Sequence, residues 1–181
     1  HATEEDAFGR RWHARLSASG KLYSYRLCAG RVLDPLDRRQ RVHVTRPLDV
    51  SRMRQAAAAH LTGPAVDCAA LANRRAGEPN MLDSPPELSM RVIRSIEVVD
   101  EGGGHVRIDV HLKSALYKMV RNLVGLLLAV GVGELSVEDV PPLLATRDRS
   151  KLPPPAPAHG LTLEAVYYRT GWQARYSHPL H

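Results

Sequence analysis

The stretch "MRVIRSIEVVDEGGGHVRIDVHL", residues 90–112, contains two apolar segments separated by acidic residues and glycines. The second segment carries apolar side chains at every other position, namely Val106, Ile108, Val110 and Leu112. Alternate residues of a strand point to the same side, so these side chains share one face of a predicted strand. The "DEGGG" centre is typical of a hairpin turn. The stretch therefore predicts an antiparallel hairpin with one apolar face.

The hairpin is followed by "KSALYKMVRNLVGLLLAVG", residues 113–131, which predicts a helix that continues directly from the second strand. On a helix its apolar residues gather on one side: Leu116, Met119, Leu123, Leu126, Leu127 and Val130. The other side carries Ser114, Tyr117, Lys118, Arg121 and Gly125. The polar stripe ends at Arg121, which places a guanidinium at the floor of a cleft. Arg121 is then either a structural arginine that binds a carbonyl or core carboxylate, or a functional cation that orients an anionic group.

Other segments complete an α+β pattern. Alternation predicts strands at residues 21–27, 41–45 and 161–168, and an alanine-rich body predicts a helix within residues 47–63, with Asp49 or Ser51 as its N-cap. A shorter helix is expected over residues 136–146, opened by Ser136 and Asp139. Residues 74–87 and the proline-rich residues 151–160 are expected to be loops. Together the elements predict a largely antiparallel sheet flanked by helices.

The charge balance favours a polyanionic partner. The 181-residue chain has 25 Lys and Arg against 19 Asp and Glu, a net charge of +6 and a pI near 9.7, which is typical of nucleic-acid-binding proteins although a solvated basic surface has the same composition. The candidate phosphate-binding residues are Arg10, Arg11, His13 and Arg15, then Arg38, Arg39 and Arg41, then Arg74 and Arg75, and finally Lys118. We expect at least two of the three arginine clusters to contact RNA phosphates.

Several classes of protein are disfavoured. No apolar run reaches the roughly 20 residues of a membrane span, so a soluble protein without a membrane partner is expected. Cys28 and Cys68 have neither paired spacing nor a neighbouring histidine cluster, which argues against a disulfide framework or a zinc site. No histidine spacing typical of a metal site, phosphate-binding loop, dinucleotide fingerprint or nucleophile elbow occurs.

Four stretches together resemble one family. They are "RWHARLSASGKLYSYRL", "ALYKMVRNLVGLLLAVG", "DRS" and "PAHGLTLEAVYY", and they span residues 11–168 in the order in which the family has them. The chain resembles the tRNA pseudouridine synthase A (TruA-like) family. The resemblance implies a pseudouridine synthase-like domain over residues 1–170 with a tail at 171–181. It also implies isomerisation of uridine in the anticodon arm of tRNA, no metal or organic cofactor, a homodimer, and an intracellular setting in the cytoplasm or an organelle matrix.

The resemblance also implies roles for three residues. Arg121 matches the arginine that the family pairs with its catalytic aspartate, Tyr23 matches the tyrosine that stacks near the target uracil, and Leu161 matches an apolar residue of the base pocket. We expect these three side chains to converge on one cleft. In this interpretation Arg121 keeps a carboxylate ionised, because a neighbouring opposite charge lowers the pKa of a buried aspartate.

The family's aspartate lies in a Gly-Arg-Thr-Asp motif upstream of the segment matched by "HAR", and these residues contain no such motif. Asp6, the one aspartate before His13, follows no Gly-Arg-Thr. Two hypotheses stay open: the chain is the part of a synthase without its nucleophile, or it is a non-catalytic RNA-binding or structural subunit of a ribonucleoprotein, with rRNA as partner.

Overall fold

A computed structural model describes residues 13–14, 16–30, 32 and 34–168. The predicted hairpin is confirmed: β4 (Met90–Gly102) pairs antiparallel with β5 (His105–Leu112). All four alternating apolar residues of β5 are buried. The turn depends on glycine, because Gly102, Gly103 and Gly104 all have positive φ angles of 82°, 61° and 82°.

The hairpin lies inside a six-stranded sheet with the order β2-β1-β5-β4-β3. The remaining strands are β1 (Ala18–Ala29), β2 (Val42–Val44), β3 (Gly63–Asp67) and β6 (Leu161–Tyr168). β6 pairs antiparallel with the first part of β1, and β2 pairs parallel with the last part. All other pairings are antiparallel, so the expected largely antiparallel sheet is confirmed.

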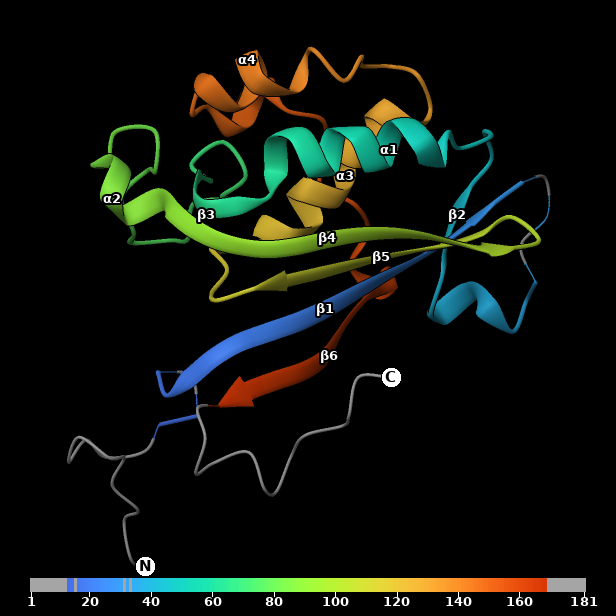
Figure 1. Cartoon of the computed structure of the whole chain (residues 1–181), viewed down its shortest axis with the longest axis horizontal. Helices are drawn as coiled ribbons and strands as arrows, with labels where there is room; N and C mark the ends of the chain where they lie inside the picture. Colours follow the sequence, from blue (N-terminus) through green and yellow to red (C-terminus); the bar gives the residue numbers. More distant parts are fainter. Residues whose placement is uncertain (1–12, 15, 31, 33, 169–181) are drawn as a thin grey trace, which may run out of the picture.

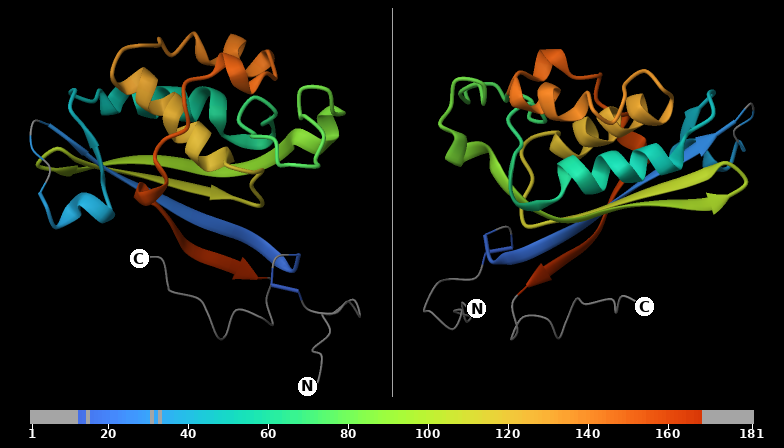
Figure 2. Two further views of the ribbon diagram at one scale, coloured as in Figure 1. Left: turned by 180° about the vertical axis from the view of Figure 1, so that it is seen from behind. Right: turned by 45° about the horizontal axis from the view of Figure 1, so that its top comes forward.

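The longer helices lie on one side of the sheet, so the fold is α+β as predicted (Figures 1 and 2). They are α1 (Val50–Ala56), continued by the π-helical turn Ala57–Leu61, then α3 (Met119–Gly131) and α4 (Val140–Ala145). Short pieces are α2 (Pro86–Ser89) and the 3-10 turns Asp37–Arg39, Arg149–Lys151 and Ala158–Gly160. Asp49 is the N-cap of α1, since its Oδ1 accepts a hydrogen bond from Arg52 N at 3.0 Å.

The core lies between this side of the sheet and the helices. β1 and β5 contribute Tyr25, Leu27 and Ile108, and α3 contributes Leu123 and Leu127, all fully buried. Burial of such side chains supplies the main driving force for folding. The alternation in the strands and the apolar face of α3 therefore meet as the sequence indicates.

Two expectations about element limits are wrong, and one strand was not predicted. The helix expected from residue 113 begins only at Met119, because Lys118 adopts a left-handed φ of 57° and the backbone before it makes tertiary hydrogen bonds instead. Asn73 N, for example, donates to Tyr117 O at 3.0 Å. β3 escaped prediction because Pro64 and Gly63 argue against a strand. The loop expected over residues 74–87 ends earlier, where α2 begins.

Candidate functional site

Tyr23 lies in a pocket of about 580 Å³ near the start of β1. Three segments form it: β1, the loop that contains Arg75 and Glu78, and residues 113–118 just before α3. Its lining carries four basic side chains, from Lys21, Arg75, Lys113 and Lys118, and one acidic side chain, from Glu78. Partial burial raises the pKa of the Tyr23 phenol above its ordinary value. The pocket thus combines an aromatic ring with an excess of positive charge.

Tyr117 forms part of the same pocket and holds two cations against its ring. The guanidinium carbon of Arg75 lies 4.7 Å from the ring centroid, and Lys118 Nζ lies 5.4 Å from it. Both distances are typical of cation–π contacts. Arg75 also has a loose ion pair with Glu78, with 3.8 Å between Nη1 and Oε1. Sequence reasoning identified Arg75 and Lys118 separately but missed that Tyr117 joins them.

A buried asparagine connects the two segments that carry these cations. Asn122, in α3, is fully buried and donates from Nδ2 to Leu71 O at 2.5 Å and to Asn73 Oδ1 at 2.8 Å. Asn73 in turn donates its backbone N–H to Tyr117 O. These bonds fix the start of the Arg75 loop against the segment that precedes α3. The "MVRN" stretch was the available signal for Asn122, but the sequence did not predict the structural role of this residue.

Arg147 holds the far end of the same loop. It donates from Nη2 to Ser84 O at 2.8 Å and to Met81 O at 3.2 Å, and its Nε lies 3.1 Å from Asp67 Oδ2. Its own φ is 57°, a left-handed conformation that a non-glycine residue adopts only at a cost. The surrounding bonds offset that cost, and the loop is anchored at both ends.

Arg121 is partly buried on α3 and touches the proline-rich loop. Its Nε donates to Ala156 O at 2.7 Å, so the structural interpretation, an arginine that binds a carbonyl, is correct for this nitrogen. Among the described residues no carboxylate lies within ion-pair distance of Arg121, and neither terminal nitrogen is fully buried. The two terminal nitrogens can therefore still bind an anion.

The structure places Arg121 and Leu161 next to Tyr25. Tyr23 lies two residues before Tyr25 in β1. Leu161 is paired with Tyr25 across the β1–β6 ladder, while Tyr23 is paired with Leu163. Burial raises the pKa of the Tyr25 phenol, and the charge of Arg121 opposes that rise. Tyr25 OH donates to Pro157 O at 2.7 Å. Arg121 and Leu161 do not line the Tyr23 pocket, and the roles of all three residues stay predictions.

The basic clusters lie far apart. Arg38 and Arg39 are exposed in the 3-10 turn near β2, at the opposite end of β1 from the Tyr23 pocket. A 12-residue strand such as β1 spans roughly 36 Å. Arg41 is engaged in ion pairs with Asp37 at 3.5 Å and Glu101 at 3.0 Å. The cluster of Arg38, Arg39 and Arg41 and the basic residues of the Tyr23 pocket could therefore share a ligand only if that ligand extended along β1.

The N-terminal cluster is mostly outside the described residues. Arg10, Arg11 and Arg15 belong to that undescribed part. His13 is described and exposed, and its backbone N–H donates to Ser17 Oγ at 3.0 Å. Arg74, next to Arg75, is exposed and donates from Nε to Glu78 O at 2.9 Å. Its donation closes the turn that presents Arg75.

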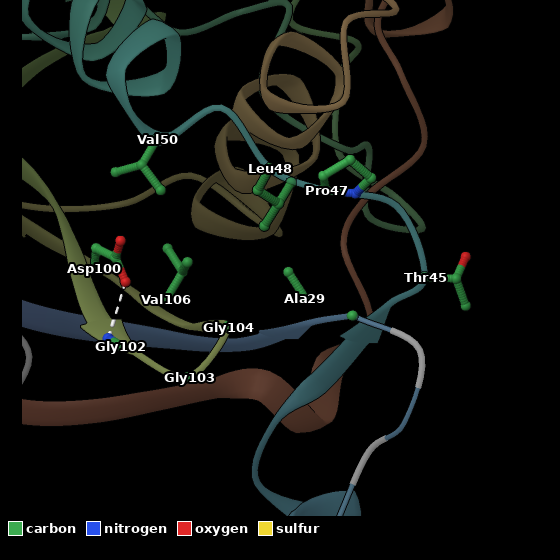
Figure 3. A pocket seen from close by; sticks show the side chains of 11 residues that line it. Ala29, Thr45, Pro47, Leu48, Val50, Asp100, Gly102, Gly103, Gly104 and Val106 are labelled. Atoms are coloured by element: carbon green, nitrogen blue, oxygen red, sulfur yellow. Dashed lines mark hydrogen bonds between the residues drawn. The ribbon is translucent and has the colours of Figure 1, made fainter.

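A second pocket of about 500 Å³ lies at the hairpin end of the sheet (Figure 3). Leu48, Val50 and Val106 point into it, and glycines of the turn form its edge (Figure 3). Its one carboxylate, from Asp100, accepts a hydrogen bond from Gly102 N at 2.9 Å. This pocket has few groups for chemistry, and the Tyr23 pocket is the better candidate site.

Among the described residues, no three His, Cys, Asp or Glu side chains are grouped so that they could hold a metal ion. No helix in the same part of the chain combines the length and the apolar character needed to cross a membrane.

Comparisons with known proteins agree on one family. Residues 76–169 match the model of a family described as tRNA pseudouridine synthase. The chain is 38% identical over 178 residues to the tRNA pseudouridine synthase A of Myxococcus xanthus, covering 94% of this chain and 59% of that protein. It is 34% identical over 158 residues to tRNA pseudouridine synthase A 2 of Bacillus anthracis, covering 87% and 60%. It is 37% identical over 166 residues to the tRNA pseudouridine synthase A of Oleidesulfovibrio alaskensis, covering 87% of this chain and 58% of that protein. The chain spans about three fifths of the length of these relatives.

Proposed function

Because the chain belongs to the tRNA pseudouridine synthase family, we propose that it is the part of a synthase that isomerises uridine to pseudouridine in tRNA. The names of the relatives support tRNA as the substrate. The relatives reported above are all named as tRNA pseudouridine synthases, which favours the synthase over a structural ribonucleoprotein subunit.

One observation carries the proposal. Arg121 is held at Nε by the carbonyl of Ala156, while its terminal nitrogens have no acidic partner among the described residues. A guanidinium fixed in this way presents two parallel N–H donors, which suit a carboxylate. We propose that this carboxylate is the aspartate of the family's Gly-Arg-Thr-Asp motif, which residues 1–181 do not contain.

The pairing would prepare the carboxylate for its reaction. A positive charge at hydrogen-bond distance lowers the pKa of an aspartate, so the group stays ionised at neutral pH. In the family's reaction the carboxylate initiates cleavage of the C1′–N1 bond of the uridine. The uracil rotates, C5 bonds to C1′, and the proton on C5 is released. Tyr23, a half-buried ring that lines the pocket, is the proposed stacking partner of the uracil, and Leu161 is the proposed apolar contact.

The proposal predicts a specific pattern of activity. Release of the C5 proton from labelled uridine in unmodified tRNA measures the reaction. The 181-residue chain alone should release none, because positioning groups cannot break the glycosidic bond without the attacking group. Release should appear when a segment with the aspartate motif is added. Turnover by the chain alone would mean that the nucleophile lies within these residues, and no release in either mixture would contradict the proposed activity.

The oligomeric state is a further part of the proposal. The family resemblance suggests a homodimer, and sedimentation of the protein encoded by the complete reading frame tests it.

A further inference from the structure

We propose that Arg75, Tyr117 and Lys118 form a binding site for one backbone phosphate of the RNA substrate, within the pocket that Tyr23 also lines. The identity of the ligand as RNA rests on the proposed function. The phosphate site itself rests on the contacts of these three residues and on the charge of the pocket.

The first support is the local excess of positive charge. Four basic side chains and one carboxylate line the pocket. The carboxylate, on Glu78, lies 3.8 Å from Arg75 Nη1, too far for a hydrogen bond, and both side chains are about half exposed, at 52% and 53%. A loose exposed pair of this kind has little stability. A phosphate can therefore replace Glu78 as the partner of Arg75 and form shorter, charge-assisted hydrogen bonds.

The second support is the ring that holds the two cations together. Arg75 and Lys118 both contact the ring of Tyr117, although like charges repel. The negative face of an aromatic ring reduces that repulsion without neutralising either cation. Tyr117 is 39% exposed, so the arrangement is open to solvent and to a ligand. An anion placed near the two cations would remove the remaining repulsion.

The third support is backbone strain at Lys118. Its left-handed φ of 57° is unfavourable for a residue with a Cβ atom. A tertiary bond holds the segment directly before it, because Asn73 N donates to Tyr117 O at 3.0 Å, while Lys118 O accepts the first backbone bond of α3 from Asn122 N. Strain that the fold maintains in this way is common at binding sites. The first residue of α3, Met119, follows directly, so the positive end of the helix dipole adds to the same potential.

Binding of a tRNA anticodon stem-loop at several KCl concentrations tests the site. The protein is that encoded by the complete reading frame, and the variants are Arg75→Ala, Lys118→Ala, Tyr117→Phe and Tyr117→Leu. A matched control is Arg46→Ala, because Arg46 is also about half exposed and paired with a glutamate, Glu134, at 2.7 Å. Arg46 contacts Val132 O, just after the opposite end of α3.

We expect Arg75→Ala and Lys118→Ala each to reduce the slope of log affinity against log salt by about 0.7 to 0.9. Between 1 M and 0.1 M salt, each variant should therefore gain roughly sixfold less affinity than the unmodified protein gains. Arg46→Ala should leave the slope unchanged. Tyr117→Phe should bind like the unmodified protein because it keeps the ring face, whereas Tyr117→Leu should weaken binding. Unchanged slopes for both Arg75→Ala and Lys118→Ala would overturn the phosphate site.

Proton release separates this inference from the proposed function. The two cation variants should raise KM for tRNA and leave kcat nearly unchanged, as expected for binding that is equal in the ground and transition states. If the protein forms pseudouridine but the slopes do not change, the phosphate site is wrong and the function stands. If it forms none but the slopes fall, the function is wrong and the RNA site stands.

Discussion

Arg121 and Ala156 are joined by two hydrogen bonds: Arg121 Nε donates to Ala156 O at 2.7 Å, and Ala156 N donates to Arg121 O at 3.0 Å. The pair connects the first turn of α3 to the proline-rich loop, which the sequence places far away. It also determines the direction of the guanidinium, because a planar group fixed at Nε can rotate little. The terminal nitrogens are therefore oriented before any substrate binds.

Replacing Arg121 with Lys should reduce kcat beyond what a loss of stability explains. Lysine keeps the positive charge but has no Nε donor and no bidentate edge, so it cannot hold a carboxylate in the same geometry. We expect kcat for C5 proton release to fall roughly 100-fold. Loss of this hydrogen bond from a charged group to a carbonyl should cost about 1.5 to 3 kcal/mol in the free energy of unfolding.

Arg149→Lys is the matched control for that variant. Arg149 binds the same loop, through Leu152 O at 3.0 Å and Pro153 O at 2.7 Å. It should lower stability by a similar or larger amount and leave kcat within a few-fold. Equal losses of kcat in both variants would mean that Arg121 acts only by holding the loop.

Two substitutions at Lys118 separate charge from strain. Lys118→Gly and Lys118→Ala both remove the cation, but glycine adopts a positive φ without steric cost. We expect the glycine variant to be more stable than the alanine variant by about 0.5 to 1 kcal/mol in urea unfolding, since the steric relief exceeds the entropy that glycine loses on folding. An alanine variant at least as stable as the glycine variant would disprove strain at this position.

Gly125→Ala should destabilise the protein although alanine is the better helix former. A Cβ atom at Gly125 would overlap the carbonyl oxygen of Pro154, which is backbone and cannot move aside cheaply. Overpacking of this kind costs about 1 to 3 kcal/mol. A Cβ at Gly131, in the same helix, would meet the flexible side chain of Met53 instead. Urea unfolding should therefore show a smaller loss for Gly131→Ala, and the opposite order would contradict the close approach of the proline-rich loop.

The Tyr25 phenol should make stability fall at high pH. Burial raises its pKa in the folded protein, while the unfolded chain ionises near a pKa of about 10. Above that pH the unfolded state releases a proton that the folded state retains, so the free energy of unfolding decreases as pH rises. The stabilisation is fully present below pH 10. Denaturation between pH 9 and 11.5 should show a steeper loss for the unmodified protein than for Tyr25→Phe, and parallel curves would contradict the assignment.

The elements that the sequence predicted well are those with a local cause. Residues 90–112 alternate in polarity around glycines that only a tight turn requires, and they form the hairpin as expected. The N-cap Asp49 and the apolar face of α3 follow from contacts within a few residues. The family could also be inferred from the sequence, because its motifs keep their order along the chain.

The tertiary structure decided what depends on distant contacts. Lys118 looks like a helical residue in the sequence, but the hydrogen bond from Asn73 to Tyr117 holds the preceding segment outside the helix, so the polar stripe predicted through Ser114 and Tyr117 does not form. The same contact brings Arg75 beside Tyr117. Periodicity reports only neighbours one or two turns away, whereas the pairing of Arg75 with Tyr117 depends on how a loop and a helix start pack together, and that packing exists only in the folded chain.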